Sequence, residues 1–193
     1  MVYDLIYDLP TSVEFGGREW EINTDFRDVL NILTAFEDEE LTNQEKAYVC
    51  LHNLYVDFDE IPPQYAQEAY DAAIAFIDHG NQDDKNKPSK KTMDWTQDAP
   101  LIFPAVNHVA GFEVRSADYI HWWTFMGYFM EIKDSTYSTV LSLRQKKAKG
   151  KKLEKYEQEY WKNNRAICEI KKRETAEERA YKEEMRKLFG AKG

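Results

Sequence analysis

The densest apolar stretch of the chain is residues 119–132, where almost every side chain is aromatic or a large aliphatic. At helical spacing these side chains form one wide stripe, made of Tyr119, Trp122, Trp123, Met126, Phe129 and Met130. A helix that is apolar around most of its circumference is typically buried among other helices. The pattern therefore predicts a central buried helix, capped by Ser116, against which the rest of the chain packs.

The first element expected from the pattern is a β-hairpin in residues 9–22. Apolar and polar side chains alternate on both sides of Gly16 and Gly17, and paired glycines suit the positive φ angles of a two-residue hairpin turn. An isolated hairpin is only marginally stable, so we expect it to pack on another part of the chain. Asn23 or Thr24 is the expected N-cap of that helix.

Three amphipathic helices are predicted between the hairpin and residue 80. The first carries apolar residues at helical spacing up to Phe36. The second begins at a capping box formed by Thr42 and Glu45. The third begins at the proline pair 62–63 and ends at Gly80, because proline is tolerated in a first turn and glycine favours a helix C-terminus.

The second half of the chain is also predicted to be helical. A short helix capped by Asp98 should run to Gly111, and another should span residues 135–148. Apolar residues near heptad spacing predict one long helix over residues 151–172, followed by a terminal helix that begins with a capping box at Thr175. The predicted fold class is mainly α, with an N-terminal β-hairpin followed by one or more helical bundles.

A polar stretch without periodicity, residues 81–96, separates two parts of opposite charge. The chain up to Trp95 contains 7 Lys and Arg against 21 Asp and Glu, a net charge of −14, whereas the remainder contains 19 against 14, a net charge of +5. This split predicts an acidic hairpin-plus-helices module in residues 1–80 and a helical module around the aromatic helix in residues 97–193. Residues 81–96 are then a linker, and Trp95 at its end is expected to dock onto one module.

No residue pattern in the sequence points to catalysis, to a cofactor or to a metal. Cys50 and His52 are two positions apart and face different sides of a helix, so a core cysteine beside a surface histidine is favoured over a metal site. His121, inside the aromatic stretch, is expected to be a hydrogen-bonded core or boundary residue, with a pH-sensitive contact as the alternative. We therefore expect a protein that is not an enzyme and that holds no cofactor.

The two cysteines are too few for a disulfide framework. The longest apolar run is shorter than the ~20 residues that a membrane-spanning helix needs. We expect a soluble protein of a reducing cytoplasm without contact to a membrane.

The candidate partner-binding residues are aromatic anchors and a lysine-rich turn. They are Trp95, Trp122, Trp123, Phe125, Lys146, Lys147, Lys149, Lys151 and Lys152. For the tryptophan pair a core position is the favoured interpretation, with partial exposure to a partner as the alternative. For the lysines a solvated interhelical turn is favoured over a docking patch for an acidic protein, including this chain's own N-terminal half. Nucleic acid is the least favoured partner, because the whole chain is acidic and no aromatic residues lie between the lysines.

Three stretches resemble the bacteriophage gene-product-fifteen family, which occurs in tailed phages and in prophages of Gram-positive bacteria. They are LPTSVEFGGREWEINTDFR at residues 9–27, WWTFMGYFMEI at 122–132 and STVLSLRQKKAKGKKLEKYEQEYWKNN at 138–164. They are distributed over residues 9–164 in the family's order. The last charged helix resembles nothing diagnostic.

The resemblance implies a tail-morphogenesis protein, usually encoded between the major tail-tube protein and the tape-measure protein. Proteins from that position are regarded as tail assembly chaperones, so the implied partner is the tape-measure protein, with the tail-tube protein and self-association as further candidates. The implied location is the host bacterial cytoplasm, with absence from the mature virion. A minor tail or connector component of the virion is the alternative, and a nucleic-acid-binding regulator is a distant one. In several phages the gene at this position also encodes a short and a long product through ribosomal frameshifting. An acidic first half, a linker and a basic second half would be consistent with such an arrangement.

Overall fold

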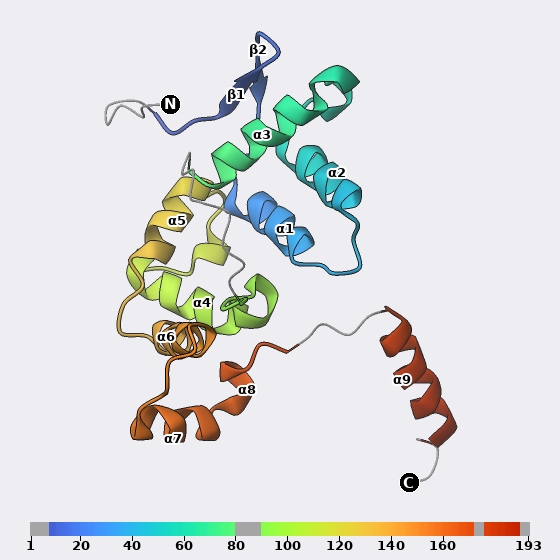
Figure 1. Ribbon diagram of the computed structural model, residues 1–193. Coiled ribbons are helices and arrows are strands. Elements are labelled where there is room, and N and C mark those ends of the chain that lie inside the picture. Colours follow the sequence, from blue (N-terminus) through green and yellow to red (C-terminus); the bar gives the residue numbers. More distant parts are fainter. Residues whose placement is uncertain (1–7, 80–89, 172–175, 190–193) are drawn as a thin grey trace.

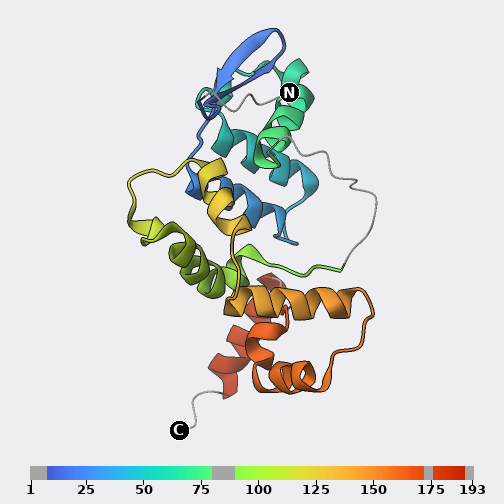
Figure 2. The same ribbon diagram turned by 90° about the vertical axis from the view of Figure 1, so that its left-hand side faces the viewer.

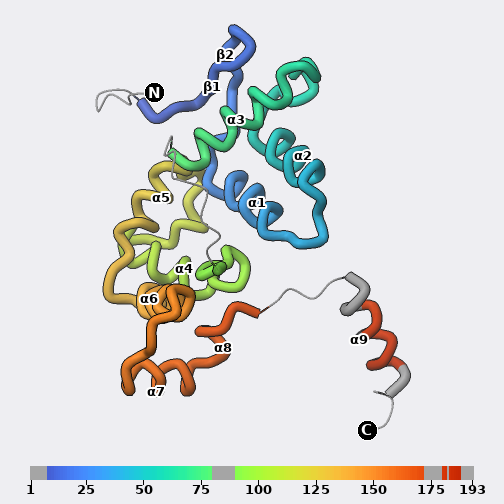
Figure 3. Tube along the Cα trace, in the orientation of Figure 1, coloured from blue at the N-terminus to red at the C-terminus, as the bar shows by residue number. Residues whose placement is uncertain are grey.

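The computed structural model describes residues 8–79, 90–171 and 176–189, and it is mainly α with a small N-terminal hairpin, as predicted (Figures 1 and 2). The strands are β1 Ser12–Phe15 and β2 Arg18–Glu21, and the helices are α1 Phe26–Phe36, α2 Asn43–Leu54, α3 Ala66–Ile77, α4 Trp95–Ala110, α5 Trp122–Met130, α6 Thr136–Ala148, α7 Lys155–Asn163, α8 Arg165–Cys168 and α9 Ala176–Phe189. Short 3-10 turns occupy Phe58–Glu60, Pro63–Tyr65 and Val114–Ser116. In Figure 3, α9 stands apart from the other helices.

The predicted hairpin is confirmed. Phe15 pairs with Arg18 in the antiparallel register, which leaves Gly16 and Gly17 as a two-residue turn with φ angles of 58° and 73°. Both angles lie in the left-handed region that a primed turn needs and that glycine adopts without strain. The Phe15 ring packs edge-on against Tyr55 at the end of α2, with centroids 5.6 Å apart. The hairpin therefore packs on the helices, as a lone hairpin must.

One continuous cluster of buried side chains joins the first half of the chain to α4 and α5. Phe26 of α1 stacks on Phe125 of α5 with ring centroids 4.6 Å apart. A smaller cluster, formed by Val140, Leu143 and Cys168, lies between α6 and α8. The boundaries at residues 80 and 97 stay a prediction, because residues 80–89 lie outside the described part of the chain.

Backbone hydrogen bonds also join the two halves where α1 and α5 begin. The Phe26 N–H donates to the Ile120 carbonyl at 3.0 Å, and the Trp122 N–H donates to the Thr24 carbonyl at 2.7 Å. Two helix starts are thus tied to one another across more than ninety residues of sequence. These bonds satisfy N–H groups that a helix N-terminus otherwise leaves without partners.

The predicted cap of α1 was wrong by one or two residues. Asp25, not Asn23 or Thr24, is the N-cap, and its side chain accepts a hydrogen bond from the Arg27 N–H. The Thr24 hydroxyl does not cap the helix and instead forms a hydrogen bond with the Tyr119 hydroxyl at 2.6 Å.

The predicted start of the aromatic helix was also wrong. Ser116 ends a 3-10 turn, and the N-cap of α5 is His121, whose side chain accepts from the Trp123 N–H. Because the helix begins only at Trp122, Tyr119 lies outside it and is 55% exposed, and Met130 in the last turn is 71% exposed. The helix is therefore shorter and less completely buried than its composition suggests.

Two further helix boundaries differ from prediction. The N-cap of α4 is Asp94 instead of Asp98, although the predicted end at Gly111 is confirmed by its left-handed φ of 81°. The long helix expected over residues 151–172 is divided into α7 and α8 at Asn164.

The remaining helix starts agree with prediction where they are described. Thr42 forms the predicted capping box of α2, and Ser135 caps α6. The proline pair 62–63 leads into a 3-10 turn and then α3, which ends at Ile77. Gly80 and Thr175 lie outside the described residues.

Candidate interaction surfaces

The two adjacent tryptophans of α5 close the C-terminal end of α3. The Trp122 Nε1–H donates to the Ile77 carbonyl and the Trp123 Nε1–H donates to the Phe76 carbonyl, each at 2.9 Å. The last carbonyls of a helix lack their usual partners within it, so the Trp122 indole satisfies the Ile77 carbonyl. The Phe76 carbonyl accepts from the His79 N–H at 3.2 Å as well as from the Trp123 indole. The consecutive Trp-Trp sequence is therefore a structural joint between α3 and α5.

The aromatic candidates lie together, but they differ in accessibility. Trp122 and Phe125 are 1% and 0% exposed, which makes them core residues that no partner reaches. Trp95 and Trp123 are half-buried. The Trp95 ring lies 5.1 Å from that of Phe129, between centroids, and its backbone N–H donates to a Glu37 carboxylate oxygen at 3.0 Å. Trp95 thus holds the start of α4 against both α5 and the end of α1.

The lysine-rich turn joins α6 to α7 and is partly engaged within the molecule. Lys146 forms an ion pair with the buried Glu157, a contact that raises the pKa of the lysine. The Lys147 ammonium lies 3.8 Å from the centroid of the Trp161 ring, within range of a cation–π interaction. Lys147, Lys149, Lys151 and Lys152 are exposed, and of these Lys147 lies against the Trp161 ring. The structure therefore reduces the free cationic patch to Lys149, Lys151 and Lys152.

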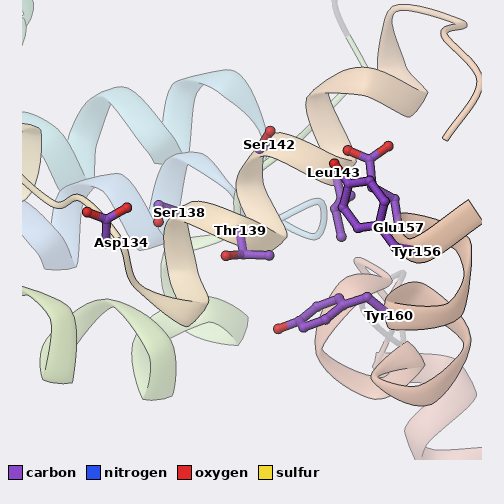
Figure 4. Close-up of a pocket in the computed structure, with 8 residues that line it drawn as sticks. All are labelled: Asp134, Ser138, Thr139, Ser142, Leu143, Tyr156, Glu157 and Tyr160. Atoms are coloured by element: carbon purple, nitrogen blue, oxygen red, sulfur yellow. The ribbon is translucent and has the colours of Figure 1, made fainter. Parts of the chain in front are cut away.

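A groove of about 450 Å³ lies between α6 and α7 (Figure 4). Its lining is rich in hydroxyl groups and consists of Asp134, Ser138, Thr139, Ser142, Leu143, Tyr156, Glu157 and Tyr160. In Figure 4 the Tyr160 ring points from α7 towards the α6 side chains, near Thr139. Tyr156 is 71% exposed at the groove. Such a surface, part aromatic and part polar, suits contact with another protein chain.

Other large apolar side chains also reach the surface. The exposed ones are Leu9, Tyr48, Val56, Phe112, Tyr119, Met130, Tyr156 and Tyr181. Single exposed apolar residues are ordinary in soluble proteins, so an exposed side chain is informative only together with the groove or helix face to which it belongs.

The sequence did not reveal a buried ion pair that organises the second half. The Arg144 guanidinium of α6 donates to both carboxylate oxygens of Asp98 in α4, at 2.7 and 2.9 Å. It also donates to the carbonyls of Thr92, Ile167 and Cys168. All five of its N–H groups therefore have acceptors, which is the condition under which a buried arginine is tolerated.

A signal for this pair was present in the sequence. Arg144 lies on the apolar stripe of α6, seven residues after Tyr137 and four after Val140. A charged residue on an otherwise apolar helix face indicates a buried partner of opposite charge. The sequence pattern around Asp98 predicts a helix cap, so it does not identify this residue as that partner.

The groups weighed for metal binding or catalysis have structural roles. Cys50 is buried, and burial raises the pKa of its thiol to about 12, while His52 is exposed as predicted. His121 accepts from the Trp123 N–H through Nδ1 and contacts the Pro10 carbonyl through Nε2, each at 3.0 Å. These partners place the imidazole proton on Nε2 and agree with the predicted hydrogen-bonded boundary residue.

Within residues 8–79, 90–171 and 176–189, no group of three or more His, Cys, Asp or Glu side chains is placed to hold a metal ion. In the same residues no helix has both the length and the apolar character needed to cross a bilayer.

Comparison with known proteins gives one match. The family model described as "Bacteriophage Gp15 protein" matches residues 5–170, which includes the hairpin and every helix from α1 to α8. No curated protein and no solved structure matches the chain.

Proposed function

Because this chain belongs to the bacteriophage Gp15 family, we propose that it is a non-enzymatic tail assembly chaperone that binds the phage tape-measure protein. The tail-tube protein and a second copy of the chain are further candidate partners. The site of action is the host cytoplasm during tail morphogenesis, and the mature virion lacks the protein. The observation that carries this proposal is the family match over residues 5–170.

The groove between α6 and α7 is the best candidate for the client site. A long helical client with apolar stripes aggregates unless its stripes are covered, and grooves between helices recognise such stripes. The groove offers Tyr156, 71% exposed, together with Tyr160 from the next turn of α7. Its volume of about 450 Å³ lies within the range of sites that take several side chains.

The lysine-rich turn lies beside this groove in sequence and in space. Lys149, Lys151 and Lys152 are exposed between α6 and α7 and would favour acidic segments of the client. The engagement of Lys146 with Glu157 and of Lys147 with Trp161 weakens the alternative of a nucleic-acid-binding regulator.

Co-expression with the tape-measure protein encoded beside this chain tests the proposal. We expect the client to become soluble and to co-purify with the chain, and expect Tyr156→Asp to reduce the recovery at least tenfold. Tyr48→Asp is the matched control, because Tyr48 is a comparably exposed tyrosine, at 56%, on the distant helix α2. Absence of any association with the wild-type chain would remove the chaperone proposal.

Mass spectrometry of purified phage particles separates the chaperone from a minor virion component. A chaperone is absent from particles or present only in traces. A stoichiometric amount in mature virions would favour the tail or connector alternative instead.

A further inference from the structure

A narrow apolar cleft opens between α1 and α4, away from the groove already described. Its volume is about 230 Å³, and it is lined by Leu30, Thr34, Trp95, Thr96, Ala99, Ile102, Phe103 and Phe125. All of these side chains are uncharged. The volume is below the ~300–1,000 Å³ of typical small-molecule pockets, so the cleft suits a large side chain of a docking helix.

The chain that follows α8 is held on the first turn of α4, next to a residue that lines the cleft. The Gln97 side chain donates to the Glu169 carbonyl at 2.7 Å and accepts from the Lys171 N–H at 2.8 Å. Gln97 directly follows Thr96, which lines the cleft. Five further steps along the backbone lead to Ala176, the first residue of α9, a span of at most about 18 Å. The terminal helix is therefore tethered within reach of the cleft.

The described part of α9 carries an apolar face without cover. Tyr181 is 62% exposed, and Met185 lies one turn later on the same side of the helix. The ion pair between Glu183 and Lys187, at 3.0 Å, lies on the opposite side. A helix with one apolar and one charged side gains stability by burying the apolar side.

One end of each surface carries charges of opposite sign, although α9 as a whole contains four Glu against four Lys and Arg. The run of acidic residues 37–40 follows α1 beside the cleft. The last turn of α9 carries Arg186 and Lys187. The family model matches residues 5–170, so α9 lies outside the part of the chain that the family model covers.

We propose that α9 docks in the cleft between α1 and α4 of its own chain, with Tyr181 as the side chain that enters it. Attachment through a few residues of the same chain gives an effective concentration on the order of 1 mM, so a contact that would be very weak between separate molecules is populated within one. The docked helix covers Trp95 and the end of α1. This arrangement concerns the chain alone and does not depend on binding of a tape-measure protein.

Cross-linking of paired cysteines in the full chain tests the docking. Thr34→Cys lies in the cleft, and Glu184→Cys lies beside the apolar face of α9 without replacing it. The control pair is Ser142→Cys with Glu184→Cys, because Ser142 is exposed on α6. The natural Cys50 and Cys168 are buried, and burial raises the pKa of both thiols, so they react slowly with a short bismaleimide.

We expect the cleft pair to cross-link within monomers at least tenfold faster than the control pair, and expect Tyr181→Asp to abolish the difference. Equal rates for the two pairs, or a rate that Tyr181→Asp leaves unchanged, would overturn the proposal. Cross-linked dimers whose yield rises with protein concentration would overturn it in favour of a second copy as occupant. None of these outcomes changes the co-purification test with the tape-measure protein, so the two proposals fail separately.

Discussion

Asp98 and Arg144, 46 residues apart in sequence, meet through two nearly parallel hydrogen bonds in a site that excludes solvent. The residues are 1% and 5% exposed. Because Arg144 also donates to three backbone carbonyls, it joins α4, the segment before α4, and α8 at a single point. This side chain, more than any aromatic one, holds the second half of the chain together.

Removing either partner of this pair should be strongly destabilising, and removing both should not restore stability. Arg144→Met leaves a buried carboxylate and three carbonyls without donors, so we expect a loss of at least about 3–5 kcal/mol in the free energy of unfolding. Asp98→Asn should cost less, because the amide oxygen still accepts from the guanidinium. The double variant should keep most of the Arg144→Met loss, since the orphaned carbonyls remain. Urea unfolding at neutral pH measures all three, and a double variant as stable as wild type would contradict this account.

The two indole donors of α5 should differ in energetic weight. Trp122→Phe leaves the buried Ile77 carbonyl without a partner, which costs about 1–3 kcal/mol. Trp123 is half-buried, so water can replace its N–H at the Phe76 carbonyl, and Trp123→Phe should cost about 0.5–1.5 kcal/mol. Chemical denaturation of the two variants gives the order directly. A larger loss for Trp123→Phe would show that the α3 end is not closed as described.

Stability should fall as the pH drops below about 6.5. Burial lowers the pKa of His121. Burial, and to a smaller extent the nearby His121, lowers the pKa of His79. In the folded state both side chains therefore favour the neutral form. A histidine whose pKa is lower in the folded state than in the unfolded state binds its proton more readily in the unfolded state. Its contribution to the free energy of unfolding is therefore complete above the unfolded-state pKa of ~6.5 and is lost as the pH falls towards the folded-state pKa. For His121 the reason is local, because a proton on Nδ1 removes the acceptor that caps α5.

His121→Asn keeps a capping side chain without a titrating group, so its melting temperature should depend less on pH between 7 and 5 than that of wild type. The remaining dependence of the melting temperature on pH, called the slope below, should decrease further when His79→Asn is added. His52→Asn, on the surface of α2, is the control and should leave the slope unchanged. An unaltered slope in His121→Asn would exclude this cap as the sensitive group.

Limited trypsin digestion tests the predicted linker. We expect the first cuts among Lys85, Lys87, Lys90 and Lys91, because a polar stretch without apolar anchors is the preferred site of cleavage. The nicked halves should stay together, since one cluster of buried side chains joins them. First cuts within residues 146–152 would show that the linker is the better protected of the two segments.

Trp95→Ala should separate the nicked halves more effectively than salt does. Trp95 lines a cleft together with Leu30 and Thr34 of α1, which belong to the other nicked half, whereas exposed ion pairs contribute only ~0–1 kcal/mol each and are screened by salt. Gel filtration of the nicked wild-type and variant proteins in low and high salt compares the two effects. Dissociation by salt alone would assign the contact to charge instead of to aromatic burial.

Local signals predicted those elements whose ends depend only on nearby residues. The Gly16–Gly17 turn and the Thr42 capping box are each contained in four consecutive residues, and both are confirmed. Side chains with distant partners could not be placed in this way. Thr24 bonds to Tyr119, so it does not cap α1, and Asp98 bonds to Arg144, so it does not cap α4.

The same reason explains the division of the predicted helix 151–172. Its apolar spacing is regular, but the Ile167 and Cys168 carbonyls accept hydrogen bonds from the Arg144 guanidinium. The chain changes direction at Asn164, which places these carbonyls beside Arg144. Of the candidate site residues, Trp95 was expected only to dock onto one module, and the structure places its ring against those of Trp122 and Phe129. The sequence could not separate the buried Trp122 and Phe125 from the half-buried Trp95 and Trp123, because exposure depends on α3 and α4 together.

The bridge between the starts of α1 and α5 sets an order of events during synthesis. Phe26 receives its backbone acceptor and its stacking partner only from Ile120 and Phe125. At roughly 5–20 residues per second, a ribosome needs about 5–20 s to travel from Asp25 to His121. Through that interval α1 can pack on α2, but the part of its apolar side that α4 and α5 cover stays exposed, so the nascent first half is itself a candidate for chaperone binding. A truncated product that stopped near residue 90 would remain in that unfinished state.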